Sequence, residues 1–258
     1  MTKAQYALIV TAIALFSGLY FGFDTKTDAQ RATERSRALT GEPTSVETLI
    51  EEAKQNLTQS QSAQIGELEQ NLQQASADIE RVALLKQLSG LWYRFGELPV
   101  AGAMAEEVAL LENADTAWSV AGALFFDALN KATDPVKRAY CADHAVKSFE
   151  NAASLKPENV EHRVNLALVY AENPPPDNPM KAVLMLRDLE SKHPDQAVVY
   201  NALGRLAIKT GQWQRAVERL EKSWSLDKSN PNTPCLLAKA YEGAGDAQKT
   251  ETFAKLCK

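Results

Sequence analysis

An unbroken run of uncharged residues follows Lys3 near the start of the chain. Residues 4–23 carry no charged side chain, and as a helix rising about 1.5 Å per residue they would span about 30 Å, the thickness of a bilayer's hydrocarbon core. Tyr6 and Tyr20 lie near its two ends, where aromatic residues meet the membrane surface. A cleaved signal peptide is the alternative, but residues 19–23 are bulky where cleavage needs small residues. We therefore expect an uncleaved transmembrane anchor over residues 1–23.

A polar stretch and two amphipathic segments follow. Residues 24–43 have no apolar period, which predicts a flexible linker. Thr44 and Glu47 have the spacing of a capping box, which predicts a helix start and a helical spacer over residues 44–81. Its second helix would present a seam with coiled-coil spacing, formed by Ile65, Leu68, Leu72, Ala75, Ile79 and Val82. Self-association through residues 65–82 is one interpretation, and a hairpin packed on itself or on the next domain is the preferred one.

From about residue 82 onward, one helical pattern recurs. Its clearest copy covers residues 197–230 and contains two apolar helical faces separated by a short turn. Gly204 and Ala216 are small enough for two helices to cross closely, and Leu220 would fill the space beside them. Gly211 would end the first helix, because a residue without Cβ takes the left-handed conformation readily. The chain therefore reads as a series of helix–turn–helix units.

The residues of this copy carry a resemblance to a known family. The segment Tyr200-x2-Leu203-Gly204-x2-Ala207, followed by Ala216-x3-Leu220, resembles the 34-residue tetratricopeptide repeat (TPR). Related copies fall near residues 82–115, 116–159, 160–196 and 231–258, the first and last of them degenerate. The resemblance implies an all-α fold, a TPR-type α-solenoid in which the repeats form a right-handed superhelix, preceded by one transmembrane helix and a helical hairpin.

Two copies contain extra residues. One has about ten more around residues 130–141, and the other has three more within residues 173–179, which include three consecutive prolines. Proline cannot continue a helix, so we expect both insertions to lie between the two helices of a repeat. A rigid inter-helix loop is the preferred interpretation, and a ridge that contacts a partner is the alternative.

The resemblance also implies a binding site. In TPR proteins the first helices line a concave groove that takes an extended peptide or a helix of a partner protein. The corresponding first-helix residues outside the packing signature are Lys86, Tyr93, Arg94, Phe126, Leu168, Asn201, Arg205, Lys209 and Lys239. Five of these are cations, so an acidic peptide or a carboxyl terminus is the expected partner. Ordinary solvated surface charge is the alternative.

Composition and the absence of known motifs argue against several classes of function. The chain has 28 Lys and Arg against 33 Asp and Glu, a net charge of −5, which argues against a nucleic-acid-binding protein. The three histidines, His144, His162 and His193, have no metal-ligand spacing, and no phosphate-binding loop or nucleophile motif is present. Glu106 and Glu107 are adjacent and read as solvated charge. We therefore expect no enzyme, no metal, no cofactor and no small-molecule substrate.

The cysteines leave one question open. Cys235 and Cys257 fall on the two antiparallel helices of the last repeat, within reach of a disulfide in an oxidising compartment. Free thiols are the preferred interpretation. Cys141 has no partner in either case.

Localisation and function follow from the layout. The resemblance to single-anchor TPR proteins of the bacterial envelope favours an inner-membrane protein with periplasmic repeats, while the count of Lys and Arg beside the anchor favours cytoplasmic repeats. We expect a membrane-anchored scaffold or adaptor that binds protein partners in its groove during assembly or maturation of envelope complexes. The alternative is a permanent structural subunit of a large membrane complex.

Overall fold

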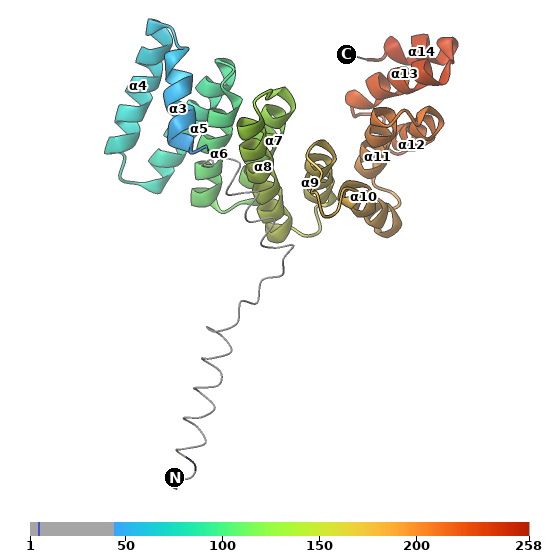
Figure 1. Cartoon of the computed structure of the whole chain (residues 1–258), viewed down its shortest axis with the longest axis horizontal. Helices are drawn as coiled ribbons and strands as arrows, with labels where there is room; N and C mark the ends of the chain where they lie inside the picture. The colour runs from blue at the N-terminus through green and yellow to red at the C-terminus, as the bar shows by residue number, and fades with distance from the viewer. Residues whose placement is uncertain (1–4, 6–43, 258) are drawn as a thin grey trace. The chain divides into compact units, whose positions relative to one another are not determined.

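The computed structural model describes Gln5 and residues 44–257, and residues 44–257 form a succession of α-helices joined by short connections (Figure 1). The predicted all-α solenoid is confirmed for this part of the chain. The predicted anchor over residues 4–23, apart from Gln5, and the linker over residues 24–43 lie outside the described residues. None of the helices in the described part has both the length and the apolar character needed to cross a bilayer.

The first described helices are α3 (Val46–Gln55) and α4 (Gln59–Gln74). The cap of α3 is Ser45, whose side chain accepts a hydrogen bond from the Thr48 backbone N–H, so the predicted start at Thr44 was wrong by one residue. α3 packs against α6 (Leu98–Glu112), and α4 packs against α5 (Asp78–Arg94). Buried Leu49, Ala53 and Ile65 join the same apolar cluster as the helices that follow. The two stripes therefore pack on the repeats.

The predicted continuous seam over residues 65–82 is wrong. α4 ends at Gln74 and α5 begins at Asp78, so the helix is interrupted between Leu72 and Ile79. Ile65 is buried inside the fold, whereas the Ile79 side chain is 83% exposed. A coiled coil needs its apolar residues on one continuous stripe, so this seam cannot pair with a second copy.

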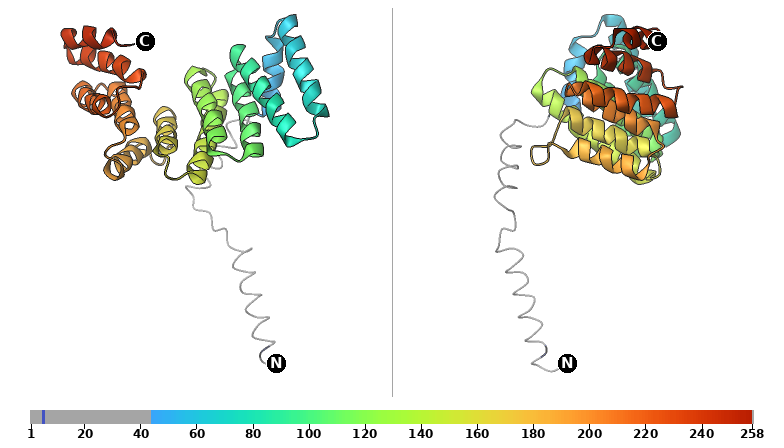
Figure 2. Two further views of the ribbon diagram at one scale, coloured as in Figure 1. Left: turned by 180° about the vertical axis from the view of Figure 1, so that it is seen from behind. Right: turned by 90° about the vertical axis from the view of Figure 1, so that its right-hand side faces the viewer.

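The helices then come in antiparallel pairs that stack in chain order (Figure 1, Figure 2). The pairs are α5 (Asp78–Arg94) with α6 (Leu98–Glu112), α7 (Asp115–Lys131) with α8 (Pro135–Leu155), α9 (Val160–Glu172) with α10 (Lys181–Lys192), α11 (Ala197–Lys209) with α12 (Trp213–Leu226), and α13 (Asn232–Ala244) with α14 (Ala247–Ala254). Each pair also packs against the next one.

Small residues allow these helices to approach closely. A Cβ added to Gly204 would lie 2.5 Å from Cγ of Leu220, and one added to Gly122 would lie 2.9 Å from the Phe149 ring. Gly211 has φ +68° and follows the end of α11. These positions confirm the roles predicted for Gly204, Leu220 and Gly211.

The two insertions differ in structure. The extra residues around 130–141 lengthen α7 and α8 to 17 and 21 residues, and the connection between them is only residues 132–134, so the predicted loop was wrong there. Asp134 caps α8 by accepting a hydrogen bond from the Lys137 N–H at 2.8 Å. The proline-rich segment, residues 173–180, does form a connection between α9 and α10, as predicted.

Candidate functional site: a cleft between α5 and α7

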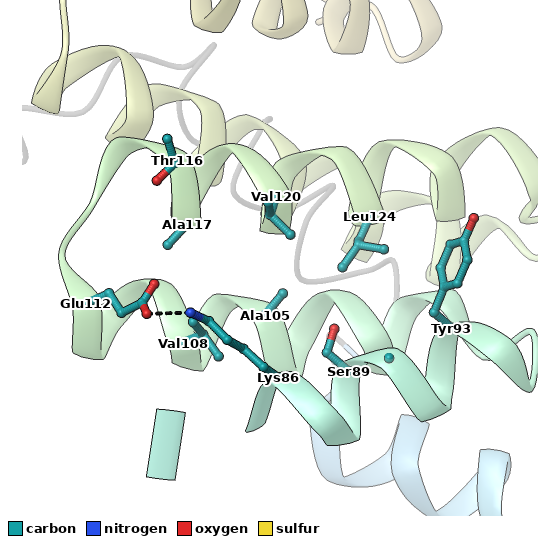
Figure 3. A pocket seen from close by; sticks show the side chains of 11 residues that line it. Lys86, Ser89, Tyr93, Ala105, Val108, Glu112, Thr116, Ala117, Val120 and Leu124 are labelled. Carbon is teal, nitrogen blue, oxygen red and sulfur yellow. Dashed lines mark hydrogen bonds and ion pairs between the residues drawn. The ribbon is translucent and has the colours of Figure 1, made fainter. Parts of the chain in front are cut away.

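The stack of first helices is interrupted at one place. α7 packs on α9, α9 on α11, and α11 on α13, but α5 and α7 have no comparable contact. A cleft of about 460 Å³ lies between them, over the surface of α6 (Figure 3). Because the cleft is concave and lined by several helices, it is the natural candidate for a binding site.

The lining of the cleft is mostly apolar. Ala105 and Val108 of α6 form its floor, and Val120 and Leu124 of α7 line one wall (Figure 3). Val108 is only 4% exposed, whereas Val120 is 56% exposed. On the α5 wall, the Ser89 hydroxyl donates a 2.8 Å hydrogen bond to the Ala101 carbonyl, so its polarity is satisfied inside the fold. The cleft therefore offers apolar surface with few free polar groups.

Polar side chains lie at the two ends of the cleft. Lys86 Nζ of α5 and Glu112 Oε1 of α6 form an ion pair of 2.5 Å at one end (Figure 3). Tyr93, with 51% of its surface exposed, stands at the other end. The ion pair is neutral as a unit, so it lends the cleft little net charge.

The structure brings only two of the predicted groove residues, Lys86 and Tyr93, into this cleft. Arg94 is exposed but lines a separate hollow that it shares with Leu68 of α4. Phe126 is half-buried and packs against two apolar clusters. Of these predicted residues, Lys86 and Tyr93 of α5 line the cleft, whereas Phe126 of α7 does not.

Two other predicted groove residues are structural. Leu168 is 8% exposed and belongs to the core, and Asn201 is 9% exposed and bonded to Thr233 of α13. Their assignment to the groove surface was wrong, because neighbouring helices cover these two positions.

The expected stripe of cations is partly neutralised. Lys209 Nζ lies 2.8 Å from Glu172 Oε2 and also donates to the Ala171 carbonyl. Lys86 is paired as described, while Arg205 and Lys239 remain exposed. A continuous positive surface for an acidic peptide is therefore absent from the described first helices.

Val120 and Leu124, which line the cleft, were missed in the sequence. They are four residues apart on one helix and fall outside the repeat signature, which is the signal that could have identified them. Their exposure depends on the distance between α5 and α7, and no local pattern encodes that distance.

An ionic cluster around the buried carboxylate of Glu106 lies between α6 and α8. Glu106, 7% exposed, accepts from Lys147 Nζ at 2.5 Å and lies 2.5 Å from His144 Nδ1. Burial raises the pKa of Glu106, but the hydrogen bonds and charges of His144 and Lys147 outweigh it and lower the pKa overall. The prediction that Glu106 is a solvated charge was wrong. Glu107 differs, because burial raises the pKa of its carboxyl above the ordinary value despite the nearby Arg81.

The other polar contacts also hold the repeats together. His162 is 3% exposed, and its Nε2 lies 2.9 Å from Asp115 Oδ2 of the preceding pair. Among residues 44–257, no three potential metal-ligating side chains gather at one place. His144 and His162 therefore link neighbouring helices through their bonds to Glu106 and Asp115.

The segment after the C-terminal helix is held covalently, because Cys257 follows α14, which ends at Ala254, instead of lying on it as predicted. Cys235 and Cys257 are joined in a disulfide, with their Cα atoms 4.7 Å apart, so the preferred interpretation of free thiols is wrong. α14 has no fully buried side chain, and Phe253 is its main apolar contact, stacked on Tyr241 with 5.7 Å between ring centroids. The bond thus fastens the end of a weakly packed helix.

Comparison with known proteins rests on structure. No protein-family profile and no curated protein matches the chain. It is similar to a tetratricopeptide repeat protein from Parabacteroides merdae, with a TM-score of 0.51, 15% identity, and coverage of 81% of this chain and 77% of that one. It is also similar to TTC0263, a TPR protein of Thermus thermophilus, with a TM-score of 0.50, 16% identity, and coverage of 77% and 100%. The paired helices and these two similarities together identify the fold of this chain as that of the tetratricopeptide repeats.

Proposed function

We propose that the chain is a non-enzymatic scaffold that binds a segment of another protein in the cleft between α5 and α7. The observation that carries this proposal is the interruption of the helix stack. The first helices α7, α9, α11 and α13 each pack on the next first helix, whereas α5 and α7 are separated by the cleft. The cleft leaves Val120 and Tyr93 more than half exposed beside a buried apolar floor. Exposed apolar surface in a concave site is typical of protein-binding surfaces.

We further propose that residues 4–23 anchor this scaffold in a bacterial inner membrane and that the repeats work in the periplasm, in assembly or maturation of envelope complexes. The uncharged N-terminal run supports the anchor. The Cys235–Cys257 bond supports the oxidising side of the membrane, because cytosolic thiols are kept reduced. Protease added to intact spheroplasts should degrade the repeats, and full protection would place them in the cytoplasm instead.

Site-specific photo-crosslinking of the full-length protein in its native membrane tests the binding role. A photoreactive residue at Val120 should crosslink a partner protein. The matched control is Leu184 of α10, which is similarly apolar and 57% exposed but lies outside the cleft. A Val120 crosslink that Gly90→Leu abolishes would support the proposal, and crosslinks at Leu184 alone would refute it.

A permanent structural subunit is the second candidate, favoured by a specific observation. Leu110, Leu155 and Leu184, on three different second helices, are 61%, 43% and 57% exposed. A subunit buried in a complex would cover such residues permanently. In the same experiment, stoichiometric crosslinks at these leucines that resist Gly90→Leu would favour this candidate.

A further inference from the structure

Building on the proposed function, we infer that the α5–α7 cleft selects an uncharged peptide segment with two large apolar side chains on one face. This occupant differs from the acidic peptide expected from the sequence. The inference rests on the charges around the cleft, on its length, and on which of its side chains are exposed.

The charges around the cleft are already paired. Lys86 Nζ is 2.5 Å from Glu112 Oε1, and the Ser89 hydroxyl is donated to the Ala101 carbonyl. Only the hydroxyls of Tyr93 and Thr116 remain as polar groups without a hydrogen bond in the cleft lining. A carboxylate entering the cleft would lose hydration and gain no free cation, which is costly. An uncharged apolar side chain has no comparable hydration free energy to lose.

The length of the cleft suits two side chains. Lys86 and Tyr93 mark its ends and are seven residues apart on α5, which corresponds to about 10 Å at about 1.5 Å per residue. In an extended segment, side chains on one face repeat every second residue, about 7 Å apart. Two such side chains therefore fit between the ion pair and the tyrosine, over Ala105 and Val108.

The lining offers apolar contacts to such side chains. Val120 and Leu124 are four residues apart on α7 and line the cleft together, with Tyr93 opposite (Figure 3). Val120 and Tyr93 are 56% and 51% exposed to solvent. A bound segment would bury this apolar surface, which favours binding. Aromatic and branched aliphatic side chains have the required shape.

Minimal peptides can test this selection on the full-length protein in nanodiscs, with its Val and Leu methyl groups labelled for NMR. We expect N-acetyl-Leu-Ser-Leu amide to shift the methyl signals of Val108, Val120 and Leu124. We expect it to bind at least tenfold more tightly than N-acetyl-Leu amide and than N-acetyl-Glu-Ser-Glu amide. The first ratio tests for two side-chain sites, and the second tests for charge.

A pair of glycine variants tests the location. A Cβ added to Gly90 meets no atom within 4 Å, so Gly90→Leu should fold and fill the cleft. Gly66→Leu on α4 makes the same change in equally open space away from the cleft. We expect Gly90→Leu to weaken binding of the Leu-Ser-Leu probe at least tenfold and Gly66→Leu to leave it unchanged. Equal binding to both variants would overturn the location.

Other outcomes overturn the inference in distinguishable ways. Tighter binding of the Glu-Ser-Glu probe would identify an acidic partner, and tighter binding of decanamide than of Leu-Ser-Leu would identify a lipid chain. If no apolar probe binds but Val120 still crosslinks a protein, this inference fails and the proposed function stands. If the Leu-Ser-Leu probe binds but Val120 crosslinks nothing, the selection stands and the proposed function fails.

Discussion

Asn201 of α11 donates a hydrogen bond from its side-chain nitrogen to the Thr233 hydroxyl of α13, at 2.9 Å, and both residues are buried. The bond joins the first helices of consecutive repeats, α11 (Ala197–Lys209) and α13 (Asn232–Ala244). A buried amide without a partner is costly, so the two side chains depend on each other.

Thr233→Val should lower the free energy of unfolding by about 1–3 kcal/mol, because it leaves the Asn201 amide buried without its acceptor. Urea denaturation followed by circular dichroism measures the change. The double variant Asn201→Leu with Thr233→Val is the control. Its loss in free energy of unfolding should be smaller than the sum of the losses in the two single variants. Strict additivity would show that the bond contributes no coupling.

Gly204→Ala should lower the free energy of unfolding by about 1–3 kcal/mol, because the new methyl group would lie 2.5 Å from Leu220 Cγ in a packed interface. Gly66→Ala is the matched control, since its Cβ meets nothing within 4 Å on helix α4. The control should stabilise the protein by about 0.5–1 kcal/mol through helix propensity alone. Thermal unfolding of both variants distinguishes crowding from propensity, and equal shifts would refute the close crossing.

Glu106→Gln should destabilise the protein at neutral pH by about 1–3 kcal/mol, because it removes the charge that His144 and Lys147 bond. The pKa of Glu106 is lowered in the folded state, so its contribution is present above the unfolded-state value of 4.5 and is lost as the pH falls below it. The difference between wild type and Glu106→Gln should therefore shrink in denaturation series taken below pH 4.5.

Glu107→Gln is the matched control for that prediction. Burial raises the pKa of Glu107, so its ionised form opposes folding above that pKa. Removing its charge should leave stability at pH 7 unchanged or slightly increased. A loss as large as that of Glu106→Gln would show that the ionic cluster does not explain the difference between these neighbours.

Cys235→Ser with Cys257→Ser should loosen α14 selectively. The disulfide closes a loop with a sequence separation of 22, for which removal costs about 3 kcal/mol in the chain-entropy estimate. Since α14 has no fully buried side chain, hydrogen exchange of its amides should rise, with α11 and α12 unchanged. Cys141→Ser does not serve as a control, because that thiol is fully buried.

Thiol chemistry on the non-reduced, unfolded protein tests the same bond directly. Alkylation should modify Cys141 alone, because Cys235 and Cys257 are joined. In the folded protein even Cys141 should resist, since burial raises its pKa to about 12 and keeps it in the thiol form. Modification of all three cysteines after unfolding would exclude the disulfide.

The sequence by itself determined the succession of helix pairs and their close crossings. A helical period places apolar residues on one face, and small residues such as Gly204 beside large ones such as Leu220 mark the crossing points, so the fold follows from local patterns. Gly211 ends its helix for a reason equally local, the absence of Cβ.

Only the tertiary structure decided which first-helix residues face solvent. Asn201 occupies the position of Lys86 in its repeat, and Leu168 occupies that of Gly90. Neighbouring helices cover Asn201 and Leu168, whereas Lys86 and Gly90 are exposed in the α5–α7 cleft. The separation of α5 from α7 depends on how each helix packs on all its neighbours, including α4 against α5 and α3 against α6. Such distances arise from contacts between residues far apart in the chain, so no local pattern could reveal the cleft.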